Sequence, residues 1–210
     1  MVLVSHKYKF IYIKNKKVAG SSVESFFGKY CLNPNLKYHY NDKIDEHNDE
    51  YGIIGSRRGG NATIWVNHKP AKEIKKELGD KMFNEYTKFC VIRNPYDKMV
   101  SKYFFRGAKT TFKEFIKNHT SSNINHYFID KKSVCNYYIR YENLEKDIIE
   151  LCKILGIENY NITELPNFKS TQRKNKNKHY SKYYDDETKS IVDKVCSKEF
   201  ELFGYKFEIL

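Results

Sequence analysis

The chain has 210 residues, and its 38 lysines and arginines against 26 aspartates and glutamates leave a formal net charge of +12 at pH 7. That length allows one domain with a sizeable core, and a hydrophobic fraction of 40% argues against a disordered chain. No apolar stretch is long enough to span a bilayer, and the first residues do not form a signal peptide, so we expect a cytoplasmic protein. The charge favours anionic partners, namely nucleic acid, an acidic membrane, a nucleotide or a polyanionic substrate.

Strands and helices are expected to alternate along the chain. In chain order, we expect a strand at 8–13, a helix at 21–31, a strand at 62–66, a helix at 70–79, a strand at 87–92, helices at 94–106 and 111–118, a strand at 134–141, and helices at 143–156 and 186–200. Asn94 is the expected N-cap of its helix, with Pro95 in the first helical position. This alternation predicts one α/β domain over residues 1–210, with a mainly parallel central sheet flanked by helices. Ligands of such sheets bind where strands end and helices begin.

Cysteines and the polar segment 31–60 limit the other possibilities. The five cysteines are widely spaced and include no C-x-x-C pair, which predicts buried thiols in a reducing compartment and does not indicate a zinc site. Segment 31–60 has no clear periodicity, which is typical of a functional or mobile segment in a compact domain.

The first strand-to-helix junction reads KKVAGSS, residues 16–22. Ala19 and Gly20 allow backbone N–H groups to approach a ligand, and Gly20 tolerates unusual dihedral angles. Ser21 and Ser22 add hydroxyl groups at a helix N-terminus, where the helix dipole favours an anion. Lys17 supplies a mobile positive charge. The alternative is an ordinary capped helix after a solvated lysine run, and the phosphate-binding pattern G-x-x-x-x-G-K-[ST] is missing.

The second junction reads VIRNPYDKMVSKY, residues 91–103. Arg93 stands at the end of a strand, and its planar guanidinium suits a phosphate group. Ser101 follows two helical turns later. The alternative is that Arg93 pairs with Asp97 and that Ser101 is solvated.

Taken together, FIYIKNKKVAGSSVE and the later FCVIRNPYDKMVSKY resemble the sulfotransferases that use 3′-phosphoadenosine 5′-phosphosulfate (PAPS), most closely the carbohydrate or Golgi-type branch. Three further segments resemble this family in the same order, namely NHKPAKEIKKELGD, IRYENLEKDIIELCKILGI and HYSKYYDDETKSIVDKVCSKEFELFGYKF. The resemblance covers nearly the whole chain. It implies a fold like that of the P-loop NTPases and transfer of a sulfuryl group from PAPS to an acceptor hydroxyl on a carbohydrate, leaving 3′-phosphoadenosine 5′-phosphate (PAP).

The resemblance also implies roles for the residues of both junctions. Lys17 resembles the family lysine at the sulfate-bridging oxygen, and the loop that holds the 5′-phosphosulfate consists of Lys17, Val18, Ala19, Gly20, Ser21 and Ser22. Arg93 and Ser101 match the pair that holds the 3′-phosphate. The chain departs from the family pattern at Lys16, where a proline is usual, and at Lys98, where an arginine is usual. Neither departure touches the matched residues.

Three later residues are matched less specifically. Tyr141 resembles a tyrosine near the adenine, and the alternative is a core aromatic. Arg173 and Lys174 resemble a late basic segment that closes over the 3′-phosphate, and the alternative is a solvated basic loop.

The acceptor hydroxyl needs a base, and His68 is the first candidate. It follows the predicted strand 62–66, and a neutral imidazole is the usual proton acceptor near pH 7. The alternative role for His68 is that of a surface histidine that caps a helix. The other candidate bases are Glu24, Glu46, Asp49 and Glu50. In-line sulfuryl transfer depends on positioning and charge stabilisation, and this logic requires no metal.

Two other functional classes compete with this interpretation. One is a nucleotide kinase or phosphotransferase of related fold, against which the missing G-K-[ST] counts. The other is a basic nucleic-acid-binding protein, for which no recognised motif is present; we therefore expect no nucleic-acid partner.

Segments 31–60 and 119–133 are expected to shape the acceptor site, and the basic charge favours an acidic or sulfated glycan over a small phenol. The sequence gives no prediction of the oligomeric state.

Overall fold

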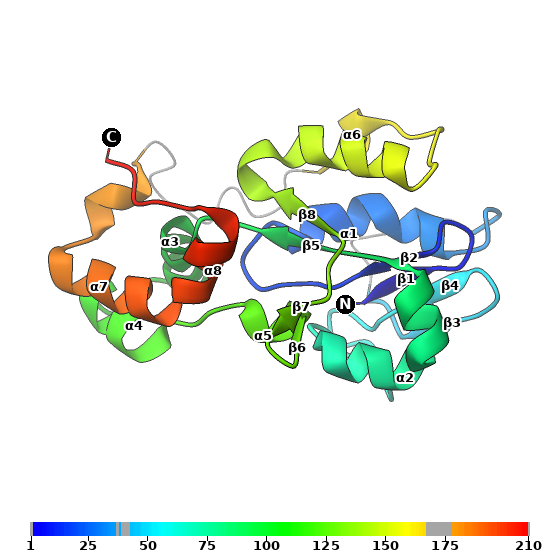
Figure 1. Cartoon of the computed structure of the whole chain (residues 1–210), viewed down its shortest axis with the longest axis horizontal. Coiled ribbons are helices and arrows are strands. Elements are labelled where there is room, and N and C mark those ends of the chain that lie inside the picture. The colour runs from blue at the N-terminus through cyan, green and yellow to red at the C-terminus, as the bar shows by residue number, and fades with distance from the viewer. Residues whose placement is uncertain (1, 37, 39–42, 167–177, 210) are drawn as a thin grey trace. The chain divides into compact units, whose positions relative to one another are not determined.

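The structure is a computed structural model that describes residues 2–36, 38, 43–166 and 178–209. The chain forms two compact units (Figure 1). The first consists of Met1–Ile92 and Asn125–Pro166, and the second of Arg93–Ile124 and Asn167–Leu210. In the described part of the chain, no helix is both long enough and apolar enough to cross a membrane.

The first unit is built on a six-stranded sheet with the order β3-β4-β1-β2-β5-β8. Its parallel part consists of β2 (Phe10–Tyr12), β5 (Thr87–Ile92) and β8 (Tyr137–Arg140), which include its two longest strands. The antiparallel part consists of β1 (Leu3–Ser5), β4 (Gly52–Ile54) and β3 (His47–Asn48). Since β2, β5 and β8 run in the same direction, their carboxyl ends meet at one edge of the sheet.

Helices cover this sheet, as an α/β fold requires. Helices α1 (Gly20–Gly28) and α6 (Leu144–Ile154) lie on one side of the strands, and α2 (Ala71–Glu85) lies on the other (Figure 1). The core beneath α1 and α6 consists of large apolar side chains, namely Phe10, Tyr12, Val23, Phe26, Phe27, Phe89, Val91, Ile139, Ile148 and Leu151. The predicted α/β class with helices around a central sheet is thus confirmed.

Short elements complete the first unit. They are the turn η1 (Lys29–Cys31), helix α5 (Ile124–Tyr127), the hairpin of β6 (Phe128–Ile129) and β7 (Lys132–Ser133), and the turns η2 (Tyr141–Asn143) and η3 (Ile162–Glu164). Helix α5 begins at Ile124, where the segment Arg93–Ile124 of the second unit ends, so the chain returns to the first unit within this helix.

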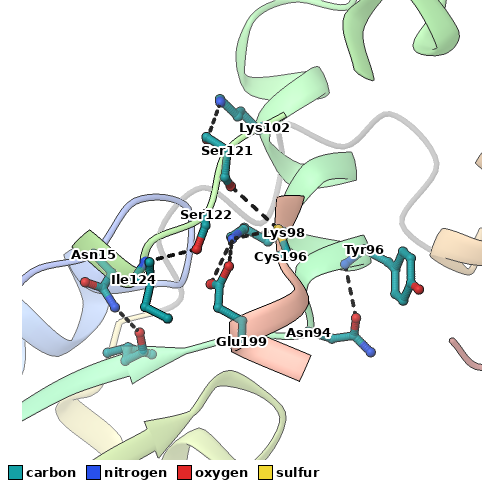
Figure 2. A network of polar contacts seen from close by, with 11 residues as sticks. Asn15, Asn94, Tyr96, Lys98, Lys102, Ser121, Ser122, Ile124, Cys196 and Glu199 are labelled. Atoms are coloured by element: carbon teal, nitrogen blue, oxygen red, sulfur yellow. Dashed lines mark hydrogen bonds and ion pairs between the residues drawn. The ribbon is translucent and has the colours of Figure 1, made fainter. Parts of the chain in front are cut away.

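The second unit is helical and has its own core. It contains α3 (Pro95–Phe105), α4 (Phe112–His119), η5 (Tyr180–Tyr183), α7 (Asp186–Val195) and α8 (Ser197–Phe203). Asn94 caps α3 by accepting a hydrogen bond from the N–H of Tyr96, as predicted. Lys98 is buried and its Nζ lies 3.0 and 3.1 Å from the two carboxylate oxygens of Glu199 (Figure 2). Lys98, one of the two departures noted in the sequence, therefore ties α3 to α8.

The predicted strand at 62–66 is wrong. Residues 61–69 form an irregular loop whose centre is held by the carboxylate of Glu46. That carboxylate accepts hydrogen bonds from the hydroxyl of Thr63 and the backbone N–H groups of Ile64 and Trp65. A side chain therefore takes the place of a neighbouring strand as the acceptor for these backbone groups.

Other boundaries also differ from the predicted ones. The helix expected over 70–79 extends to Glu85. Gly79, with φ 77°, interrupts the helical backbone conformation, and the helix resumes after it. The helix expected over 186–200 is two helices separated at Cys196. The cysteines are thiols as predicted: Cys31, Cys90, Cys152 and Cys196 are buried, and Cys135 is half-buried.

Candidate active site

The first junction is a loop between β2 and α1 with two residues in left-handed backbone conformations. Lys17 has φ 64°, and Ala19, the N-cap of α1, has φ 61° and ψ 21°. Within the described residues, the N–H groups of Ala19, Gly20 and Ser21 donate to no acceptor of the chain. The loop Lys17–Ser22 therefore presents backbone donors at a helix N-terminus, where an anion is favoured.

Gly20 is needed for space rather than for an unusual dihedral angle. It is the first residue of α1, and the positive φ angles lie at Lys17 and Ala19 instead. A Cβ at Gly20 would lie 3.0 Å from Tyr12 Oη and 3.2 Å from Lys14 Cγ. The reason predicted for this glycine is thus corrected: it lets α1 approach the end of β2 closely.

Two buried polar side chains fix the base of the loop, and sequence reasoning missed both roles. Asn15 Nδ2 donates to the carbonyl oxygen of Val91 at 2.9 Å, which ties the loop to β5 (Figure 2). Lys14 Nζ lies 2.6 Å from Glu24 Oε2, which ties the loop to α1. Apart from its two lysine neighbours, nothing in the sequence distinguishes Asn15, so only the fold could identify it.

His68 lies at this loop, although it does not follow a strand. Its Nδ1 is 3.2 Å from the carbonyl oxygen of Lys14. A carbonyl can only accept, so Nδ1 carries the proton and Nε2 keeps its lone pair. Burial and neighbouring positive charges, including Lys14, lower the pKa of His68 to about 3. The imidazole is therefore neutral at physiological pH with a free lone pair on Nε2, and a pKa this low makes it a weak base unless an anion binds nearby.

A second histidine lies beside His68. The ring centroids of His68 and His126 are 6.3 Å apart, with the ring planes nearly perpendicular. His126 belongs to α5, so segment 119–133, which was expected to shape the acceptor site, brings this residue to the candidate base.

The carboxylates considered as alternative bases hold the structure together. Burial alone would raise the pKa of Glu46, but its hydrogen bonds from residues 63–65 lower it to about 2. Asp49 accepts from the N–H groups of Tyr51 and Gly52. Glu24 is fully buried. Glu46, Asp49 and Glu24 thus each have a structural partner, and Glu50 is exposed.

The second junction supplies an arginine with a fixed orientation. Nε and Nη2 of Arg93 lie 2.8 and 2.6 Å from the same carboxylate oxygen of Asp97. Asp97 and Ser101 are four residues apart in α3, so they share one face of the helix. The predicted alternative, pairing of Arg93 with Asp97, is thus observed. It also places the guanidinium on the face of α3 that carries Ser101.

Comparison with known proteins identifies the family. The model of the sulfotransferase family matches residues 1–206. The chain belongs to the sulfotransferase family. A protein of Archaeoglobus fulgidus that carries the name "Uncharacterized protein" is 32% identical over 99 residues, which is 42% of this chain and 82% of that protein. Membership of the sulfotransferase family, read from the two motifs, is confirmed, and sulfuryl transfer by a transferase enzyme is the activity that membership supports.

The remaining candidate residues of this sulfotransferase differ in how far the structure describes them. Tyr141 is 37% exposed and lies in η2, directly after β8, so it is not a core aromatic. Its position is at the same sheet edge as the loop that follows β2. Arg173 and Lys174 lie outside the described residues. Among the described residues, no three His, Cys, Asp or Glu side chains are grouped to hold a metal ion.

Proposed function

We propose that the chain transfers a sulfuryl group from PAPS to a hydroxyl group of a carbohydrate. One observation carries the proposal: a loop with available backbone N–H groups lies at the N-terminus of α1, in a chain of the sulfotransferase family. Such a loop can bind an anion through its backbone N–H groups. It does not need the G-K-[ST] sequence that a site for β- and γ-phosphates requires.

In this proposal, the loop Lys17–Ser22 holds the 5′-phosphosulfate and Lys17 stabilises the bridging oxygen as the S–O bond breaks. Arg93 and Ser101 bind the 3′-phosphate, which distinguishes PAPS from other adenine nucleotides. Tyr141 contacts the adenine, and Arg173 and Lys174 close over the 3′-phosphate. The product nucleotide is PAP.

The acceptor hydroxyl attacks sulfur in line with the leaving oxygen. A new O–S bond forms, the bond from sulfur to the bridging oxygen breaks, and the hydroxyl proton passes to Nε2 of His68. The low pKa of His68 keeps Nε2 unprotonated before the donor binds. An anionic donor next to Lys14 and Lys17 offsets their positive charge, which raises the basicity of His68 when the proton must be accepted.

Nucleotide binding measured by calorimetry tests the donor. We expect PAP to bind more tightly than ADP and ATP, because only PAP carries a 3′-phosphate. Equal or tighter binding of ATP would favour a phosphotransferase. Salt-sensitive binding of nucleic acid without binding of PAP would favour the second alternative. Incubation with PAPS labelled in its sulfate, against carbohydrates and phenols in parallel, tests the acceptor class.

A further inference from the structure

A buried ion pair lies beneath the candidate active site. Lys14 and Glu24 approach to 2.6 Å, and their side chains are 7% and 0% exposed. A second pair, Lys29 of η1 with Glu164 of η3, has the same N···O distance but is 36% and 54% exposed. Removing charges from water is costly, so a buried pair is maintained only when its geometry is well fixed.

Lys14 contacts two parts of the site through different groups. Its side chain reaches Glu24, in the second turn of α1, and its backbone carbonyl accepts the hydrogen bond from Nδ1 of His68. It also lies against Gly20, where its Cγ would be 3.2 Å from an added Cβ. Movement of Lys14 would therefore shift the loop Lys17–Ser22. It would also shift the Lys14 carbonyl oxygen, which accepts the hydrogen bond from His68.

The tautomer matters because only one nitrogen of a neutral imidazole can accept a proton. With Nδ1–H donating to Lys14, the lone pair is on Nε2. The backbone of His68 is itself in a left-handed conformation, with φ 60°, which is uncommon for a residue other than glycine. The carbonyl of Lys14 is the hydrogen-bond partner that the structure gives to the imidazole ring.

We propose that Lys14 and Glu24 are positioning residues: their buried pair fixes the Lys14 carbonyl, which holds His68 as the Nδ1–H tautomer with Nε2 as the proton acceptor. The inference rests on the proposed role of His68 as the base. Glu24 therefore serves the reaction without touching the substrate.

The test uses three variants of the full chain. Glu24→Gln removes the charge of one partner but leaves the ammonium of Lys14 buried, so it can fail to fold. The double variant Lys14→Met/Glu24→Gln removes both charges, which buried pairs tolerate better. Glu164→Gln breaks the exposed pair of equal length and is the matched control.

Two measurements are made on each folded variant. Nitrogen-15 NMR of the histidine rings at neutral pH reports the tautomer of His68, assigned with His68→Gln, and needs no acceptor substrate. Calorimetry with PAP reports the nucleotide site. In the double variant we expect a mixture of tautomers, weaker PAP binding because the loop shifts and one positive charge is lost, and, once an acceptor is found, a fall in kcat of roughly tenfold to a hundredfold. Glu164→Gln should match the wild type in all three.

A double variant that keeps the Nδ1–H tautomer overturns the inference, whatever its activity. The proposed base role fails separately: wild-type turnover in His68→Gln would remove it, while the NMR measurement would still show whether the pair sets the tautomer.

Discussion

Two neighbouring lysines at the loop Lys17–Ser22 differ in exposure and form a matched pair for mutagenesis. Lys16 is exposed, whereas Lys17 is half-buried and has φ 64°. We expect Lys17→Ala to lower kcat more than it weakens PAP binding, because negative charge on the bridging oxygen grows as the bond breaks. Lys16→Ala should change kcat little. The role assigned to Lys17 would be wrong if its loss raised KM and left kcat intact.

Arg93 gives a prediction about which phosphate is recognised. Arg93→Ala should weaken PAP by roughly tenfold to a hundredfold, since a charged hydrogen bond contributes about 1.5–3 kcal/mol. Adenosine 5′-phosphosulfate, which has no 3′-phosphate, should lose little affinity. Asp97→Asn serves as the comparison, because it keeps the guanidinium and removes the carboxylate that orients it. Equal losses for both ligands would show that Arg93 supports the fold instead.

The pKa of His68 predicts a dependence of stability on pH. An unfolded histidine titrates near 6.5, whereas burial and nearby positive charge lower the pKa of folded His68 to about 3. Between these values the unfolded state binds more protons, so the free energy of unfolding should fall as pH drops from about 6.5 toward 3. His68→Gln should reduce this loss. Urea unfolding of both proteins at pH 7 and pH 5 measures it; an unchanged difference would contradict the shift.

At the scale of elements, the loop 61–69 gives the sharpest prediction. Its centre is held by one carboxylate, and its end carries His68. Glu46→Ala removes all three hydrogen bonds, so we expect faster hydrogen exchange at the amides of Ile64 and Trp65 and a lower kcat. PAP affinity should stay near the wild-type value, because the loop Lys17–Ser22 is untouched. Slow exchange at both amides would show that other contacts hold the loop.

Elements with a strong local signal were predictable from the sequence. Strand β5 and helix α3 have such signals, namely an apolar run for the strand and the Asn94-Pro95 cap for the helix. Residues 62–66 have the apolar composition of a strand, yet the structure gives them Glu46 as a partner, which no local pattern reveals. Strands β1, β3 and β4, of two or three residues each, were not predicted.

The site residues also divide into those with a local sequence pattern and those whose partners are distant in the sequence. The loop Lys17–Ser22 and the pair Arg93 and Ser101 could be proposed as anion-binding residues because each set lies within one short segment that resembles a family motif. Asn15 could not, because its amide bonds to Val91, a residue far away in the chain.

At the scale of the whole molecule, the net charge of +12 predicts how association responds to salt. A positive protein attracts an anionic nucleotide over distances of about 10 Å at 0.1 M ionic strength, and salt screens this attraction. The association rate of PAP should therefore fall as sodium chloride rises from 0.05 to about 0.5 M, with a smaller change in dissociation rate. Stopped-flow fluorescence measures both rates. An association rate independent of salt would contradict this role of the charge.

The order of strands also has a consequence for how the chain folds. β5 lies between β2 and β8, and it pairs Thr87 with Phe10 on one side and Phe89 with Tyr137 on the other. A chain emerging from the ribosome therefore cannot complete this sheet until residue 140 has been made. Until then β5 has an open edge with unpaired backbone groups. Because such distant pairings close large loops, the first unit should fold more slowly than a helical protein of the same length.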